Sequence, residues 1–291
     1  MHELPYRPVL PVLRRALRAA GVLAIVAVAG PAPGCGSSLP EPASPLFVVP
    51  LSVEGESVGS ALVDTGGGYE VMLRRDYGLK IVDSTEVIVF GGIQTVDITE
   101  SFSYTAGGVS AVAESAIVGA SVCGCNGVGF HFFRKTGVVL GLDFAQPAVV
   151  FLAEVPPGSF TIDFDPLPEE RSTFDTSFIG VEVELDGASQ NLIGLLDTGA
   201  NATVLRSDLA GGWERFAMGS MVATITHPVL GSVSVHVRLS SNRDLPDIIL
   251  GTDAMSKWAD QWYFSFRARG GSFTVVRDGG SFTPADAQPP L

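Results

Sequence analysis

The residues best suited to chemistry in this 291-residue chain are two aspartates, Asp64 and Asp197, each within the tripeptide Asp-Thr-Gly. An apolar segment precedes each aspartate (residues 61–63 and 194–196), and a second apolar segment follows each tripeptide. A strand that carries a carboxylate into the interior incurs a large desolvation cost, so a buried aspartate normally has a partner. The two copies lie 133 positions apart (197 − 64), and each aspartate can serve as the partner of the other.

A single Asp-Thr-Gly would be weak support for such a site, because about one chain in ten of this length and composition contains one by chance. Two copies in the same apolar setting favour a pair of facing aspartates, and two surface turns of an all-β protein are the alternative. Two carboxylates within hydrogen-bond reach cannot both ionise cheaply, so they share a proton. Such a pair offers a base and an acid side by side.

The two segments resemble the active-site loops of aspartic peptidases, in which two Asp-Thr-Gly loops meet at a twofold or pseudo-twofold axis. The resemblance covers most of residues 46–278 and is to two retropepsin-like halves fused in tandem, as in pepsin. It implies an all-β, bilobal fold and an endopeptidase that hydrolyses peptide bonds with a water activated by the two aspartates. It also implies that the Thr65 and Thr198 hydroxyls brace the loops, that the Gly66 and Gly199 NH groups donate to the carboxylates, and that no cofactor or metal is needed.

Each half of such an enzyme also has a later apolar-apolar-Gly segment that crosses behind its aspartate loop. Residues 138–143 and 248–253 match this pattern in the required order. We therefore expect Gly141 to pack beneath the first aspartate loop and Gly251 beneath the second, because only a residue without a Cβ lets two backbones approach so closely.

A candidate flap follows the first loop, where two apolar arms flank Gly91, Gly92 and Ile93. Gly91 lies 27 residues after Asp64 (91 − 64), near the position at which retropepsin-like halves place the flap that closes over bound peptide. An ordinary β-hairpin is the alternative, since Gly-Gly turns are common. The second lobe is short between its loop and its glycine motif, so we expect a single flap.

The first loop departs from the family pattern at Gly67 and Gly68, where the family usually has one Ala or Ser after Asp-Thr-Gly. The extra glycine predicts a more pliant loop. Ala200 fits the pattern of the second loop. Neither Gly67 nor Ala200 offers the hydroxyl that pepsin-like enzymes use to stabilise the ionised form, which predicts a higher upper pKa of the pair.

The N-terminal residues 1–34 resemble an export signal, with arginines before an uncharged run at residues 19–30 that is too short to span a bilayer comfortably. Cys35 follows in a segment that resembles an imperfect bacterial lipoprotein cleavage box. Two interpretations stay open: a lipid anchor on Cys35 at the cell envelope, or ordinary export with an unmodified thiol.

A short segment rich in acidic residues and proline divides the remaining chain into two lobes, at residues 46–165 and 174–278. A short helix is expected over residues 253–262, in the second lobe. Three further segments are rich in proline, glycine or polar residues: a flexible tether at 35–45, a linker at 166–173 and a disordered tail at 279–291.

Cys123 and Cys125 lie in a glycine-rich run with only His131 nearby, so a zinc site is poorly supported. In an oxidising compartment a small-ring disulfide between them is favoured, and two free thiols are the alternative.

The chain has 31 acidic and 18 basic residues, a net charge of −13. This charge argues against nucleic acid and anionic lipid as direct partners. We expect a monomer that acts on a peptide or protein and touches a membrane only through an N-terminal lipid. A protease-shaped lobe pair that binds an extended peptide or envelope partner without cutting it is the alternative, although the two acids and two threonines favour catalysis.

Overall fold

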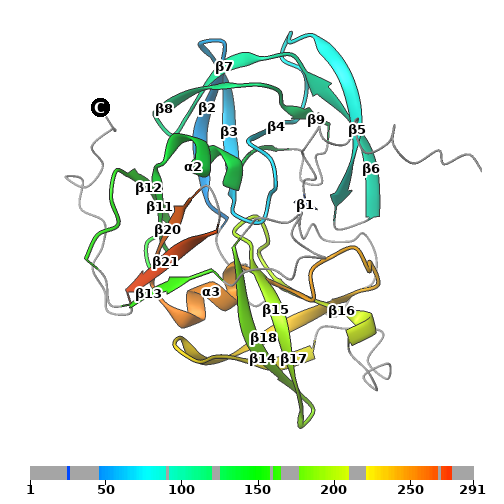
Figure 1. Ribbon diagram of the computed structural model, residues 1–291, viewed down its shortest axis with the longest axis vertical. Coiled ribbons are helices and arrows are strands. Elements are labelled where there is room, and N and C mark those ends of the chain that lie inside the picture. The colour runs from blue at the N-terminus through cyan, green and yellow to red at the C-terminus, as the bar shows by residue number, and fades with distance from the viewer. Residues whose placement is uncertain are drawn as a thin grey trace, which may run out of the picture.

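The computed structural model describes residues 25–26, 46–89, 92–119, 125–157, 160–164, 177–209, 221–267 and 270–276. Over these residues the chain is mostly β and forms two lobes that share a sheet (Figure 1). The all-β, bilobal fold expected from the sequence is confirmed.

The N-terminal lobe is built on a ten-stranded sheet in the order β1-β5-β6-β9-β4-β10-β3-β2-β7-β8. Its first hairpin, β2/β3, follows the alternating pattern of its sequence: Val49, Leu51 and Val53 of β2 face the core. The elements of this lobe are β1 (Ile25–Val26), β2 (Val48–Val53), β3 (Glu56–Asp64), β4 (Val71–Leu73), β5 (Ile81–Val89), β6 (Gly92–Thr99), β7 (Phe102–Ala106), β8 (Val109–Ala113), β9 (Ile117–Val118), β10 (Asn126–Gly129) and α2 (Phe130–Thr136).

The C-terminal lobe is a closed six-stranded barrel in the order β14-β15-β19-β16-β18-β17. Its first hairpin, β14/β15, repeats the plan of β2/β3 and ends directly before Asp197. Its elements are β14 (Phe178–Leu185), β15 (Ala188–Leu196), β16 (Thr203–Arg206), the 3₁₀ turn η2 (Ser207–Leu209), β17 (Met221–His227), β18 (Gly231–Ser240), β19 (Ile248–Leu250) and α3 (Thr252–Trp258).

A five-stranded sheet with strands from both lobes joins them, in the order β12-β11-β20-β21-β13. Strand β11 of the first lobe pairs antiparallel with β20 of the second, and buried rings of Trp262, Phe264 and Phe273 stack on its face. This apolar packing fixes the lobes relative to each other. The strands are β11 (Val139–Asp143), β12 (Ala148–Leu152), β13 (Phe160–Asp163), β20 (Gln261–Phe266) and β21 (Gly271–Val276).

The same arrangement of elements occurs once in each lobe. In the first lobe, β10 lies parallel to β3 and antiparallel to β4, and helix α2 follows it. In the second lobe, β19 lies parallel to β15 and antiparallel to β16, and helix α3 follows it. Strands β10 and β19 are therefore the crossing segments behind the two aspartate loops.

This repeat confirms the prediction for Gly251 and shows that the prediction for Gly141 was wrong. A Cβ on Gly251 would lie 2.7 Å from the Ala202 carbonyl oxygen, so this glycine packs against the second loop. Gly141 instead lies within β11, in the sheet between the lobes. The counterpart of Gly251 is Gly129, where a Cβ would lie 2.5 Å from the Gly67 carbonyl oxygen.

Helix α3 confirms the expected helix of the second lobe, although it begins at Thr252 and ends at Trp258. Helix α2 was not predicted; it ends at Gly137, whose φ of 71° suits a residue without a side chain. Neither α-helix in the described residues, each seven residues long, has the length or apolar character to cross a membrane. The expected leader, tether, linker and tail lie outside the described residues, apart from β1.

We predict that Gly129→Ala destabilises the fold by about 3 kcal/mol or more, because the new methyl would meet rigid backbone oxygens of the first loop. Gly251→Ala, which meets backbone of the second loop, should behave alike. Urea unfolding measures both. If Gly129→Ala leaves the unfolding midpoint unchanged, β10 is not the crossing strand.

Candidate active site

The two aspartates lie at equivalent places, at the ends of β3 and β15, and both are fully buried. Each carboxyl group acts directly on the pKa of the other, so the two lie within reach of a shared proton. Each loop glycine packs on the opposite acid: a Cβ on Gly66 would lie 2.5 Å from Cγ of Asp197, and one on Gly199 would lie 2.8 Å from Cγ of Asp64. The prediction of facing aspartates is confirmed.

The predicted threonine brace is also confirmed, and it is reciprocal. The Thr65 hydroxyl donates to the Leu196 carbonyl (2.8 Å) and accepts the Thr198 NH (3.1 Å). The Thr198 hydroxyl donates to the Val63 carbonyl (2.7 Å) and accepts the Thr65 NH (3.0 Å). Four buried hydrogen bonds between residues more than 130 positions apart therefore hold the loops together.

Backbone NH groups of each loop act on the carboxylate of the same loop. The Gly199 NH donates to Asp197 Oδ1 (2.8 Å), and the Ala200 NH, which binds the Asp197 backbone carbonyl (3.3 Å), also lowers the pKa of Asp197. The Gly66 and Gly67 NH groups lower the pKa of Asp64, although Asp64 Oδ1 has no hydrogen-bond partner in the described residues. Such donors favour the ionised form of a carboxylate and lower its pKa.

The sequence argument missed Tyr69, whose hydroxyl donates to Asp64 Oδ2 at 2.8 Å. The expectation that neither loop offers a stabilising hydroxyl to its aspartate is therefore wrong for Asp64. It holds for Asp197 within the described residues. Asp197 Oδ2 is buried and has no hydrogen-bond partner in the described residues apart from what the facing carboxyl supplies. The available signal was an aromatic residue with a polar tip five positions after the aspartate.

Gly67 has a packing role in the first loop. Residues 64–69 are all buried. A Cβ on Gly67 would lie 2.5 Å from Cε1 of Tyr69 and 2.7 Å from Asp64 Oδ2. The departure from the family pattern at this position therefore makes room for the tyrosine ring.

Burial raises the pKa of both aspartates, since the charged form loses its hydration. The pKa of Asp197 is raised further because it also faces the negative charge of Asp64. The donors to Asp64, including Tyr69, oppose the rise at that residue. The surroundings of the pair therefore favour the negative charge on Asp64 and the proton on Asp197.

The flap candidate is a long hairpin, β5/β6, which pairs with β9 near its base and with the two-residue strand β1 at Ile88–Val89 of β5. Ile88 of β5 packs against a second-lobe cluster that includes Ala200, beside Asp197. Gly92 begins β6 and Ile93 is exposed, while Gly91 lies outside the described residues. The corresponding hairpin of the second lobe, β17/β18, is closed into the barrel through β14.

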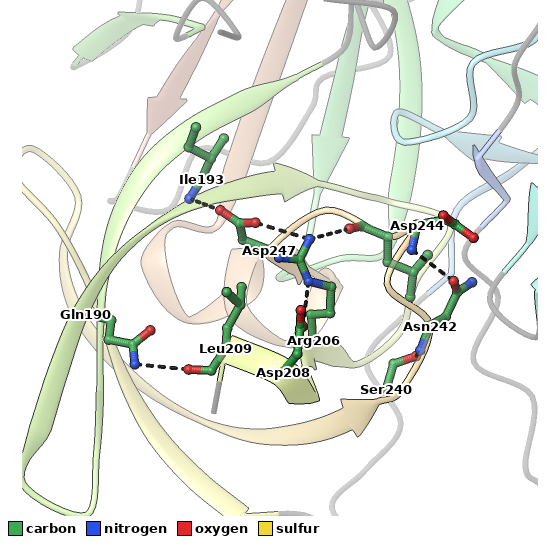
Figure 2. A network of polar contacts seen from close by, with 10 residues as sticks. Gln190, Ile193, Arg206, Asp208, Leu209, Ser240, Asn242, Asp244 and Asp247 are labelled. Atoms are coloured by element: carbon green, nitrogen blue, oxygen red, sulfur yellow. Dashed lines mark hydrogen bonds and ion pairs between the residues drawn. The ribbon is translucent and has the colours of Figure 1, made fainter. Parts of the chain in front are cut away.

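A polar cluster in the second lobe fixes the strands that carry the Asp197 loop (Figure 2). Arg206 at the end of β16 binds Asp208 (2.7 Å) and Asp247 (3.4 Å) and donates to the Leu245 carbonyl (3.1 Å). Asp247 also accepts the Ile193 NH of β15 at 3.5 Å. The cluster thus joins β15, β16 and the segment before β19.

Cys125 is disulfide-bonded, which excludes two free thiols. Cys123 and Cys35 lie outside the described residues, so the expected pairing of Cys125 with Cys123 stays a prediction. Within the described ranges, no group of three or more His, Cys, Asp or Glu residues is placed to hold a metal ion.

Comparisons with known proteins agree with this geometry at the level of fold. No protein-family model matches the sequence, and no curated protein matches it significantly. The structure is similar to the crystal structure of the aspartic proteinase from Irpex lacteus, with a TM-score of 0.53 and 12% identity, over 83% of this chain and 96% of that one. At this identity the likeness shows a common aspartic-proteinase fold.

We predict that Thr65→Val and Thr198→Val each destabilise the fold by about 2–4 kcal/mol, because each leaves a buried NH of the opposite loop without its hydroxyl acceptor and removes a donor from a buried carbonyl. The Leu196 carbonyl keeps the Ser177 hydroxyl as a second donor (2.8 Å). The double variant should cost at least about 1 kcal/mol less than the sum, since the two hydroxyls belong to one network. Urea unfolding of the four proteins gives the coupling. Thr136→Val removes a hydroxyl that donates to the Phe132 carbonyl within α2, so its effect should add independently to that of either variant. Strict additivity of Thr65→Val and Thr198→Val would contradict a shared brace.

Proposed function

We propose that this protein is an aspartic endopeptidase that hydrolyses peptide bonds in extended peptide or protein segments. The observation that carries the proposal is the buried, facing pair Asp64 and Asp197, held by a reciprocal threonine brace. Two carboxyls in one dry site differ in pKa, so one is available as a base while the other is an acid.

The unequal surroundings of the two acids support separate roles. Asp64 carries the charge, so it takes a proton from the attacking water. Asp197 carries the proton, so it polarises the peptide carbonyl and the amine leaves once it has gained a proton from the site. The reaction needs no metal or organic cofactor, since both steps are proton transfers to and from these carboxyls.

The flap hairpin supports binding of an extended substrate. Its strand β5 reaches the second-lobe cluster beside Asp197 through Ile88. Strand β1, Ile25–Val26 of the same chain, pairs in parallel with Ile88–Val89 of β5. Backbone pairing of this kind accepts an extended chain with little regard to its sequence, while side-chain pockets give specificity.

Cell location and assembly are proposed from the sequence alone. We propose that residues 1–34 export the chain and that Cys35 carries a lipid at a bacterial cell envelope, with an unanchored periplasmic or secreted form as the alternative. The net charge of −13 supports a monomer that binds neither nucleic acid nor anionic lipid directly.

Digestion of a peptide library tests the proposed activity. The wild-type protein should cleave internal peptide bonds, and Asp197→Asn should lose at least about a hundredfold in rate because it cannot give up the shared proton. Asp186→Asn is the matched control: it removes a carboxylate from an exposed turn whose φ of 50° asparagine tolerates. It should cleave like the wild type.

Two other outcomes would contradict the proposal. Equal cleavage by wild type and Asp197→Asn would place the chemistry elsewhere or in a contaminant. Library peptides that bind and are recovered intact would favour the non-catalytic lobe pair. In that case Asp197→Asn should bind the same peptides.

We predict that Ala200→Ser moves the alkaline limb of the pH–rate profile downward by about half a pH unit or more. Asp197 Oδ2 lacks a donor, and a serine hydroxyl beside it would stabilise the ionised form and lower the pKa of the pair's second ionisation. Loss of the shared proton defines this limb, so activity should begin to fall at lower pH. An unmoved or raised limb in a folded variant would refute this account.

A further inference from the structure

The side chain of Tyr69 is held in place from every side that the structure describes. It is 1% exposed, and its hydroxyl lies 2.8 Å from Asp64 Oδ2. Its ring belongs to an apolar cluster that includes both strands of the flap hairpin. The buried members of that cluster are Leu62, Tyr69, Met72, Val87, Val96 and Ile117.

Three glycines surround this ring and leave the space that it fills. A Cβ on Gly67 would lie 2.5 Å from Cε1, one on Gly127 would collide with the hydroxyl, and one on Gly129 would lie 3.0 Å from Cδ2. The glycines come from the aspartate loop and from β10, so two segments far apart in sequence fit one side chain. A position so closely packed holds the hydroxyl in a single geometry.

The second lobe has no counterpart of this contact. Ala200 of the second loop is equivalent to Gly67 of the first, because the backbone carbonyl of each accepts the NH of the first residue of a helix. The Phe130 NH of α2 donates to Gly67 (3.0 Å), and the Thr252 NH of α3 donates to Ala200 (2.8 Å). Yet Asp197 Oδ2 has no hydroxyl donor in the described residues. The two loops therefore share a backbone plan and differ in the donor to the outer carboxylate oxygen.

We propose that Tyr69 is a positioning residue of the catalytic pair, and that its hydroxyl directs the shared negative charge to Asp64 and leaves the proton on Asp197. This inference rests on the proposed function and adds to it the residue that decides which acid is the base. Tyr69 donates throughout the working pH range, because burial raises its pKa and the charge of Asp64 raises it further.

Charged side chains other than the two aspartates also lie near Tyr69. They come from the ends of β-strands and from α2, and they border a cavity of about 490 Å³ that reaches Tyr69. Glu70 among them is bound to Lys135 (3.0 Å) and Tyr104 (2.8 Å). None of these side chains contributes to the pKa shift of Asp64. The titratable groups that border the cavity are Glu70, Glu114, His131, Arg134 and Lys135.

The proposal predicts which limb of a pH profile depends on Tyr69. As pH rises, the pair passes from doubly protonated to singly ionised and then to doubly ionised. The first step puts the charge on Asp64, beside the Tyr69 hydroxyl, and the second step ionises Asp197. Loss of the hydroxyl therefore raises the lower pKa of the pair and changes the upper pKa much less.

The test compares Tyr69→Phe with wild type by two readouts: the pH dependence of kcat/KM on a cleaved library peptide, and ¹³C-NMR titration of labelled aspartate carboxyl carbons. We expect the acid limb and the lower pKa to move upward by about one pH unit, with the alkaline limb nearly in place. Tyr104→Phe is the matched control, since it removes a buried hydroxyl of equal bond length that binds Glu70. It should move neither limb.

A second variant guards against a folding defect in Tyr69→Phe. 3-Fluorotyrosine at position 69 keeps the ring and hydroxyl and donates more strongly, so the lower pKa should move downward. Opposite shifts in the two variants support the proposal, because a merely structural role would not reverse sign. An unmoved lower pKa, or equal movement of both limbs, would overturn it.

The two readouts separate this inference from the proposed function. If wild type cleaves nothing while the NMR shifts occur as expected, the peptidase proposal fails and the role of Tyr69 in placing the charge stands. If cleavage occurs and depends on Asp197, but Tyr69→Phe leaves the lower pKa unchanged, the inference on Tyr69 fails alone.

Discussion

The burial of two carboxyl groups against each other is the constraint on which the rest of this structure depends. Neither Asp64 nor Asp197 is exposed, and an ionised carboxylate removed from water is costly unless protein donors replace its hydration. Glycines at positions 66 and 199 let the opposite acid approach, and backbone NH groups supply the donors. The aromatic sheet between the lobes and the threonine brace then hold this unfavourable pair in place.

The pseudo-twofold symmetry of the two loops holds for their backbones but not for their side chains. The brace repeats with nearly equal distances on both sides, and Gly129 and Gly251 pack beneath equivalent loops. Among the described residues Tyr69 has no counterpart near Asp197, so the two acids differ in their hydroxyl donors although their backbones match. A symmetric scaffold can bring two acids together so that they ionise in two separate steps, but an asymmetric donor is needed to decide which acid holds the first charge.

The lobes also differ in how they treat their strand edges. The second lobe closes its described strands into a barrel, which includes the hairpin β17/β18. The first lobe extends β5/β6 toward the second lobe, where Ile88 meets the cluster around Ala200. An edge strand that pairs with only one neighbour along most of its length can accept a further strand, as β5 accepts β1.

The sequence by itself determined the two acids, the threonine and glycine residues beside them, Gly251, the β5/β6 hairpin and the all-β class. These features are local: each is a short motif or an alternating pattern whose meaning does not depend on distant residues. The sequence did not determine the crossing strand of the first lobe. An apolar-apolar-Gly pattern occurs in any buried strand, and it selected Gly141 of β11, whereas the true crossing strand, β10, has only Val128 as an apolar residue. Strand β10 can lack large side chains because Tyr69 fills the space beside it. Only the tertiary structure brings Tyr69, Gly127 and Gly129 together, since strand register and side-chain fit arise from contacts between segments about sixty positions apart (129 − 69).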